Sequence, residues 1–475
     1  MNALTIWVIL PGIAAVILYV LRRWEQAVNI AGLVIALLLA ALAWQLPIGK
    51  PIPLHLWATM PTISISASLP VFGATFSLAD PLRPLLVMIY LTVGFWFGGA
   101  YSARAGRLFT PLGLAIAVIL VAALAVTPAT YAAMFIEIAI LFCVPLFSPP
   151  GKPVTRGVRR FITFQSIGMV LVLVADYFLA VASLPDSRLG DQRIAILAVG
   201  LGFALILPVF PFHSWIPMLA GETNPYSAAF VFNLLPSAVS FFILDFLIRY
   251  TGTAAAPEIY AAFRTIGALM VLVGGLWAVY ENHLGRMLGF ITIQQIGSAL
   301  LALSMNEIAS PALPLMGLFF AQLLTHSIGL AAYSYSLTVL GQQFPSLLIK
   351  DVAGAARRVP ILSAGVILGI FSLAGLPFLA SFPVYFALWS TLAKIYPSLA
   401  FIALLGSAPI LVAGLRVLFS LINAPSETPW RVTEKGLHGS LIAISLLVLL
   451  VMGLAPQWFI PYLTNMAVLI SNPFP

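Results

Sequence analysis

Long runs of apolar residues recur along the whole chain, and charges, prolines or glycines interrupt them. A run of about 20 apolar residues crosses a bilayer as a helix. Cutting the chain at the interruptions predicts fourteen membrane spans, at residues 3–21, 27–46, 83–103, 109–126, 130–147, 160–183, 193–217, 225–249, 263–280, 286–304, 312–340, 360–393, 397–422 and 437–457. Arg22 and Arg23 follow the first run, which is the wrong flank for a cleaved signal peptide, so we expect a retained anchor. The pattern predicts an all-α integral membrane protein.

Residues 61–78, between the second and third spans, follow a different pattern. Apolar side chains alternate at Ile63, Ile65 and Ala67, and Val71 follows beyond a Leu-Pro pair. Alternation with a period of two around a turn residue is typical of a β-hairpin. We predict a short hairpin at the outer membrane surface, within an amino-terminal unit that also holds spans one to three (1–108).

Closely spaced prolines interrupt two of the predicted spans. The seventh span contains Pro208, Pro211 and Pro217, and the twelfth contains Pro377 and Pro383. Each proline removes a backbone donor and clashes with the preceding turn. We therefore expect both helices to be broken. The alternative is that proline is simply more frequent in membrane helices than in soluble ones.

The two breaks lie five spans apart, as expected for two inverted repeats of five helices, because an odd number of helices flips the second copy. The predicted units are residues 109–250 with spans four to eight, residues 251–424 with spans nine to thirteen, and residues 425–475 with the last helix and a tail. Broken helices at matching positions of two repeats mark the midplane site of many transporters.

Composition excludes an ordinary soluble globule, since 62% of the 475 residues are hydrophobic and only 8% are charged. The formal net charge of +8 has an explanation in the basic inner loops of membrane proteins, so no nucleic-acid partner is expected. Cys143 is the single cysteine, which excludes a disulfide framework and an iron–sulfur or multi-cysteine metal site in this chain. We expect no cofactor and no bound metal.

The distribution of lysine and arginine predicts the orientation. With the amino terminus outside, fourteen cations lie on the inner loops and seven on the outer loops and span ends. Because inner loops carry the excess of cations, both termini are predicted on the outer side.

Few strongly polar side chains lie inside the predicted spans, and each is a functional candidate. Glu137 lies in the middle of the fifth span, either as a proton carrier or as a neutral acid bonded to a neighbouring helix. His213 follows the first proline break and His326 lies in the eleventh span. Histidine shuttles protons near neutral pH, or it serves as a buried hydrogen-bonding group. Gln294 and Gln295 of the tenth span would bind water or bridge helices.

A family resemblance becomes visible around the first break. The segment PVFPFHSWIPMLAGETNPYSAA (208–229) resembles the signature PxxPFHxWLPDAHxEAPTPVSA of the antiporter-like membrane subunits of respiratory complex I, Mrp sodium/proton antiporters and membrane hydrogenases. Further segments resemble family motifs in order and spacing: FIEIAILFCVPLF around Glu137, HLGRMLGFITIQQIG (283–297) and SLAGLPFLASFPVYF (372–386). Asp80 and Arg416 also fit. The resemblance covers nearly the whole chain and implies the same fourteen-helix, inverted-repeat fold.

In family members that pump protons, the resemblance implies a midplane row of charges on the fifth, seventh, eighth and twelfth helices. The glutamate of that row matches Glu137. The three lysine positions hold neutral residues: Ile206, Pro236 and Tyr385. The tenth-helix histidine falls on Gln295, whereas the eleventh-helix histidine matches His326. The coupled lysine–glutamate pair on which a charged axis depends is missing.

Three functions follow from these residues. In a degenerate subunit the fold braces and seals a membrane arm without pumping, which is favoured because an apolar Ile206 and a helix-breaking Pro236 cannot carry a proton. In a working proton or sodium/proton translocator, Glu137, His213 and His326 relay protons with bound water, with Gln295 and Tyr385 as further candidates. A stand-alone transporter is the third possibility, and the breaks offer it no charged cluster for a polar substrate.

We predict a non-catalytic membrane-arm subunit of a complex-I-like oxidoreductase, which passes electrons from NADH or another donor to quinone in other subunits. Its partners would be homologous membrane subunits and lipids, with quinone reached only through the whole complex. Its expected location is the cell inner (plasma) membrane, with both termini on the periplasmic side. The complex, its redox partners and the transported ion stay open.

Overall fold

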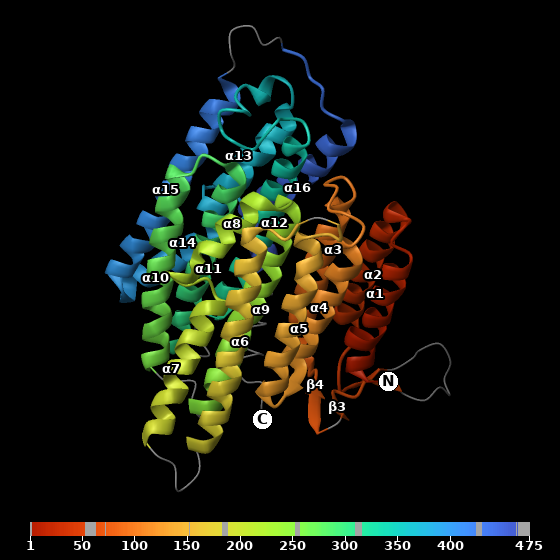
Figure 1. The fold of residues 1–475 in the computed structure, drawn as a ribbon, viewed down its shortest axis with the longest axis vertical. Coiled ribbons are helices and arrows are strands. Elements are labelled where there is room, and N and C mark those ends of the chain that lie inside the picture. Colours follow the sequence, from red (N-terminus) through yellow and green to blue (C-terminus); the bar gives the residue numbers. More distant parts are fainter. Residues whose placement is uncertain are drawn as a thin grey trace.

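The computed structural model describes residues 2–52, 63–71, 73–151, 153–182, 189–251, 257–308, 316–423, 430–461 and 463. It is a bundle of helices, most of which run along the long axis of the molecule (Figure 1). The α-helices are α1 (Leu10–Val20), α2 (Glu25–Gln45), α3 (Arg83–Ala100), α4 (Phe109–Ala125), α5 (Ala129–Phe147), α6 (Arg156–Ala182), α7 (Leu189–Ile206), α8 (Trp215–Glu222), α9 (Pro225–Thr251), α10 (Pro257–Tyr280), α11 (Leu284–Ser304), α12 (Met316–Gly341), α13 (Pro360–Ala374), α14 (Phe382–Ile395), α15 (Pro397–Ile422) and α16 (Gly436–Leu454).

A helix, or two helices in succession, lies at each range predicted to span the membrane. Within the described residues, nine helices are both long and apolar enough to cross a bilayer. The chain is therefore a mostly helical, multi-pass membrane protein. The total of fourteen crossings stays a prediction.

The hairpin predicted after the second span is confirmed. Strands β3 (Ser68–Val71) and β4 (Ala74–Ser77) pair antiparallel, with Leu69 opposite Phe76. Gly73 lies in the turn with φ +82, a left-handed conformation that glycine adopts without steric cost. Three shorter strands are also present: β1 (Pro51–Ile52), β2 (Ile63–Ser64) and β5 (Val126–Thr127), of which β5 extends the hairpin sheet. The position of the hairpin at the membrane surface stays a prediction.

Both predicted helix breaks are present. In the seventh range, α7 ends at Ile206, a 3-10 turn η3 (Phe212–Ser214) follows, and α8 begins at Trp215. In the twelfth range, α13 ends before Gly375, which has φ +80, and α14 begins at Phe382. The segments that contain Pro208, Pro211 and Pro377 are therefore the non-helical ones, whereas Pro217 and Pro383 lie in the first turn of the helix that follows.

The expectation that Pro236 breaks its helix is wrong. Helix α9 continues through Pro236 from Pro225 to Thr251. A single proline deletes one backbone donor, and membrane helices tolerate this because neighbouring groups satisfy the freed carbonyl. In the same stretch, the Ser237 hydroxyl donates to the Asn233 carbonyl (2.5 Å) and the Ser240 hydroxyl to the Pro236 carbonyl (2.7 Å), and neither bond goes to the Phe232 carbonyl that Pro236 leaves without its usual donor.

Small residues allow two helix pairs to pack closely. A Cβ atom placed on Gly168 of α6 would lie 2.8 Å from the Gly202 carbonyl oxygen of α7, and the reverse distance is 2.9 Å. Gly267 of α10 and Gly297 of α11 face each other in the same way. A Cβ atom on Gly267 would lie 2.7 Å from the Gly297 carbonyl oxygen, and one on Gly297 would lie 2.8 Å from the Gly267 carbonyl oxygen. Helices in lipid associate through such close backbone contacts, since apolar side chains gain little by leaving the equally apolar lipid.

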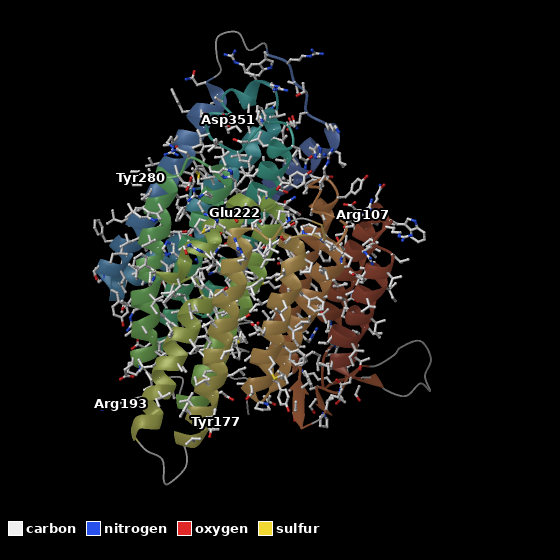
Figure 2. The ribbon with its side chains drawn as sticks, viewed as in Figure 1. Arg107, Tyr177, Arg193, Glu222, Tyr280 and Asp351 are labelled. Carbon is white, nitrogen blue, oxygen red and sulfur yellow. The ribbon has the colours of Figure 1, made fainter. Side chains whose placement is uncertain are left out.

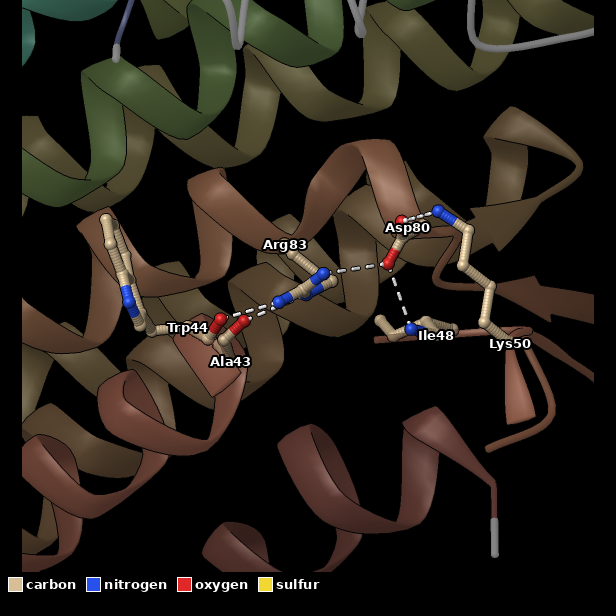
Figure 3. A network of polar contacts seen from close by, with 6 residues as sticks. All are labelled: Ala43, Trp44, Ile48, Lys50, Asp80 and Arg83. Carbon is tan, nitrogen blue, oxygen red and sulfur yellow. Dashed lines mark hydrogen bonds and ion pairs between the residues drawn. The ribbon is translucent and has the colours of Figure 1, made fainter. Parts of the chain in front are cut away.

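A polar network around Asp80 ties the amino-terminal helices together (Figure 3). Its carboxylate accepts hydrogen bonds from the Ile48 backbone N–H (2.9 Å), Lys50 Nζ (3.1 Å) and Arg83 Nη1 (3.1 Å). Arg83 also donates to two carbonyls in the last turn of α2, which have no partner inside that helix. Partial burial opposes ionisation of Asp80, but these three donors outweigh it and hold the pKa of the carboxyl below its ordinary value.

Labelled side chains in Figure 2 fall toward two ends of the bundle. Arg107, Glu222 and Asp351 lie toward one end, and Tyr177 and Arg193 lie toward the other. Arg107 belongs to a loop predicted on the inner side and Arg193 to a span end predicted on the outer side, and the two lie toward different ends of the bundle. Which end faces the cytoplasm stays a prediction.

Candidate functional site at the helix breaks

Polar side chains from several helices meet beside the second break. Tyr385 of α14 is 2% exposed, and its hydroxyl lies 3.0 Å from Gln295 Oε1 and 3.3 Å from Gln294 Oε1, both on α11. Gln295 Nε2 donates to the Leu373 carbonyl (2.7 Å) near the end of α13, and Gln294 Nε2 donates to Ser407 Oγ (3.2 Å) of α15. The positions that match the twelfth-helix lysine and the tenth-helix histidine are thus in direct contact, and both hold neutral groups.

His326 of α12 lies next to this network. Its ring centroid is 5.8 Å from that of Tyr385, and the side chain is 5% exposed. Its Nε2 atom is buried without a hydrogen-bond partner among the described residues. A cavity of about 30 Å³ is lined by His326, Gln295, Pro236 and Ser240, among others. Such a volume has room for about two water molecules.

Glu137 lies apart from that cavity, on α5. The Ser166 hydroxyl of α6 donates to Glu137 Oε1 (2.5 Å), and Oε2 is buried without a partner among the described residues. Within that same part of the chain, no lysine or arginine forms an ion pair with Glu137. The carboxyl is anchored by a neutral hydroxyl and not by a cation.

A buried glutamine also stands beside the first break. Gln165 of α6 is fully buried, and its Nε2 donates to the carbonyl of Ile206 (2.9 Å), the last residue of α7. The last carbonyls of a helix lack partners within it, and an unpaired one is costly in an apolar interior. At the second break, Gln295 Nε2 donates in the same way to the carbonyl of Leu373. At both breaks, a neutral amide donates to a carbonyl near the end of the helix that stops there.

His213 lies in the 3-10 turn of the first break. It is 9% exposed, its ring stacks on that of Phe210 with centroids 5.5 Å apart, and its Nδ1 atom has no partner in the described part of the chain. No hydrogen bond between described residues joins His213 to Glu137 or to the Tyr385 network. It is placed as predicted, but it lies outside the polar cluster.

Among the candidates predicted from sequence, the structure groups Gln295, Tyr385, His326 and Pro236 around one buried region. It places Ile206 with Gln165. Glu137 and His213 remain separate. In the described ranges, no group of three or more histidine, cysteine, aspartate or glutamate side chains is close enough together to hold a metal ion.

Several other motif residues have a clear role in holding the fold. Glu222 Oε2 accepts from the Gly157 backbone N–H (2.7 Å) in the first turn of α6, so α8 is anchored to that helix. Arg416 of α15 donates to the carbonyls of Val279 and Glu281 where α10 ends. Exposed N–H groups at helix starts favour anions and free carbonyls at helix ends favour cations, which explains both contacts.

Sequence reasoning missed Gln165, Ser166 and Ser407. The first two form a polar pair inside the apolar sixth span, in RFITFQSIGMV, and that interruption was the available signal. Ser407 carried no comparable signal, because a serine in a membrane helix commonly bonds its own backbone. Here it does so at the Ala403 carbonyl (3.0 Å) while also accepting from Gln294.

Comparison with known proteins places this geometry in a family. The profile of the family described as NADH:quinone oxidoreductase/Mrp antiporter, TM, matches residues 165–411, which include both breaks. Formate hydrogenlyase subunit 3 of Escherichia coli (strain K12) is 25% identical over 387 residues, covering 74% of this chain and 62% of that relative. NADH-quinone oxidoreductase subunit N of Moorella thermoacetica is 24% identical over 471 residues, covering 96% of this chain and 87% of that protein.

A solved structure has the same fold over nearly the whole chain. A chain of the membrane-bound sulfane sulfur reductase, an archaeal respiratory membrane complex, superposes with a TM-score of 0.81 and covers 98% of this chain and 97% of its own. At 16% identity the likeness establishes the fold alone. The family match spans the two breaks, the two buried glutamines and the His326 cavity. The chain therefore belongs to the NADH:quinone oxidoreductase/Mrp antiporter family of membrane proteins.

Proposed function

We propose that the chain is a membrane-arm subunit of a complex-I-like oxidoreductase in which the antiporter fold is kept for a mainly structural role, and that its own proton translocation is altered or lost. Electron transfer from NADH or another donor to quinone would take place in other subunits. The chain would fill a place in a row of homologous membrane subunits, seal the membrane there and brace the arm.

The contact between Tyr385 and Gln295 carries this proposal. In the pumping members that the chain resembles, these two positions hold a lysine or glutamate and a histidine. A tyrosine hydroxyl 3.0 Å from an amide oxygen forms an uncharged hydrogen bond, which does not change its charge near neutral pH. The bond from Gln295 to the Leu373 carbonyl ties the same amide to the end of α13. Both groups are thereby engaged in holding the break.

Glu137 fits the same proposal. A carboxyl passes its proton on when a neighbouring charge changes its affinity for that proton, so a relay needs a partner whose charge varies. The observed partner, Ser166, is neutral. No described cation forms an ion pair with Glu137, so we expect its carboxyl group to act as a hydrogen-bonded contact that packs α5 on α6.

The finer architecture forms part of the proposal. We infer fourteen crossings, with inverted repeats in residues 109–250 and 251–424 and additional helices in 1–108 and 425–475. The inferred location is the cell inner membrane, with both termini on the periplasmic side. The paired breaks and the separation of Arg107 from Arg193 support this arrangement.

The test is proton uptake by the reconstituted complex with Glu137→Gln, a substitution that keeps the shape and the bond to Ser166 but cannot release a proton. The number of protons moved per electron pair is expected to stay unchanged. The positive control is the same substitution in a homologous subunit of that complex whose midplane lysines are present, where the number should fall. A fall for Glu137→Gln itself contradicts the proposal.

One observation favours a second function, an active translocator. The cavity of about 30 Å³ beside His326 and Gln295 has room for water where a relay would need it. On this alternative, Glu137→Gln and His326→Gln would each lower the proton count at unchanged electron-transfer rate. If both variants lower the number of protons moved per electron pair, the chain is an active translocator and the structural role is refuted.

A further inference from the structure

An apolar groove of about 390 Å³ lies between α2, α3, α12 and α16. Helix α3 packs on α2 and α12, and α16 packs on α12, so these helices form its walls. The groove opens outward past exposed Leu37, Leu91 and Ile444. Gly98 lies on its α3 wall, and a Cβ atom placed there would meet nothing within 4 Å. The space is therefore open on a face of the molecule that is apolar enough to lie in lipid.

Most hydroxyl groups that line the groove are already paired within the protein. The Tyr226 hydroxyl donates to the Trp96 carbonyl (2.6 Å), and Ser327 Oγ accepts from Trp96 Nε1 (3.3 Å). Tyr335 contacts His438 Nδ1 (3.0 Å), and Ser445 donates back to its own helix (2.9 Å). A polar ligand would find few free partners, whereas a hydrocarbon chain needs none.

The length of the groove fits an acyl chain. Its lining residues run from Leu91 to Gly99 on α3 and from Leu441 to Val448 on α16. At 1.5 Å per helical residue, these stretches are roughly 10–12 Å long. The hydrocarbon part of one bilayer leaflet is about 15 Å thick, half of a core of about 30 Å. The groove therefore accommodates most of one chain within one leaflet.

Cations gather at one end of the groove. His438 contacts the groove residue Tyr335, and Lys435 and Arg104 lie close enough to His438 to repel a positive charge on its ring. Both cations are exposed, and neither forms an ion pair with another described residue. The adjacent carboxylate of Glu434 forms no ion pair with either cation among the described residues, and it accepts from the backbone N–H groups of Ile361 (3.0 Å) and its neighbour in α13.

We propose that this groove binds an anionic phospholipid, with one acyl chain between α3, α12 and α16 and the phosphate at Arg104, Lys435 and the first turn of α16. The start of that helix has no side-chain cap, so its N–H groups also favour an anion. Basic clusters at the membrane surface attract anionic lipids with about 1 kcal/mol per cation. This site is independent of whether the chain moves protons.

The test uses the intact complex in nanodiscs that contain phosphatidylglycerol with a photoactivatable diazirine on its acyl chain. Illumination should attach the lipid to peptides of α3 and α16. The same probe on phosphatidylcholine, which has no net charge, should label them several-fold less. Equal labelling by both lipids, or no labelling because a neighbouring subunit covers the groove, overturns the proposal.

Two variants with matched controls locate the site. Gly98→Leu fills the groove and should abolish the labelling, whereas Gly200→Leu, at a glycine on α7 that also has open space around it, should leave it unchanged. Combined Arg104→Gln and Lys435→Gln should lower phosphatidylglycerol labelling roughly ten- to thirty-fold, by the loss of two cations. Unchanged labelling in either variant overturns the proposal. Electron-transfer activity of the complex confirms that each variant is assembled.

Discussion

Replacing Tyr385 by phenylalanine tests the neutral network at the second break. The change removes one hydroxyl from a buried side chain and keeps the ring, which stacks on Trp389 with centroids 5.3 Å apart. Gln294 Oε1 would keep its bond from Gln295 Nε2 (2.8 Å), so only Gln295 Oε1 loses its partner. Leaving one buried acceptor unpaired costs about 1–3 kcal/mol, and hydrogen bonds between membrane helices contribute about 0.6–1.7 kcal/mol. We expect Tyr385→Phe to lower the free energy of unfolding by about 1–2 kcal/mol.

Two measurements on the purified complex decide this prediction. The first is the thermal midpoint at which this subunit unfolds, which should fall for Tyr385→Phe and stay constant for the control Tyr280→Phe, because Tyr280 is 73% exposed. The second is the number of protons moved per electron pair, which should not change. An unchanged midpoint refutes the hydrogen-bond argument, and a lowered proton count refutes the assignment of Tyr385 to a structural role.

Two further predictions concern stability elsewhere in the fold. Asp80→Asn should destabilise the amino-terminal helices by about 1 kcal/mol at neutral pH, since part of the charge-assisted bonding around Asp80 is lost and the site is partly exposed. The pKa of Asp80 in the folded protein lies below the ordinary value of 3.8, so the stability that its charge contributes is complete above that value and disappears as the pH falls through the folded pKa. Thermal melts of the variant and the parent should therefore differ at pH 7 and converge toward pH 3. Gly275→Val should lower the free energy of unfolding by about 1–3 kcal/mol or prevent the protein from accumulating in the membrane, because a Cβ atom there would collide with the Gly406 backbone of α15. A membrane expression assay measures this, and Gly200→Val, at a glycine with open space around it, is the control.

The helix breaks could be predicted because their cause is local. Proline lacks an N–H group wherever it stands, so Pro208, Pro211 and Pro377 interrupt their helices without help from distant residues. The hairpin was predictable for the same reason, since alternation and Gly73 act within a few residues. Pro236 shows the limit of local reasoning. A single proline leaves the rest of the helix ladder intact, and α9 continues through it.

The partners of the candidate residues could not be predicted, because they are set by how helices pack. Nothing in the local sequence around Glu137 indicates that Ser166, in the following helix, bonds to it. Tyr385 and Gln295 are 90 residues apart, and family resemblance named both positions without showing that they touch. Candidate positions could be named from the sequence, whereas the contacts between them depend on how the helices pack.

The broken helices have a physical basis that does not depend on pumping. A break inside the membrane leaves carbonyls unpaired, and each must find a donor in an interior that holds little water. A buried lysine can supply that donor, but an amide can do so without the cost of burying a charge. Gln165 and Gln295 supply it here, to Ile206 and Leu373. Neutral amides therefore bond a carbonyl at each of the two breaks of this chain, as the structural role that we propose for it requires.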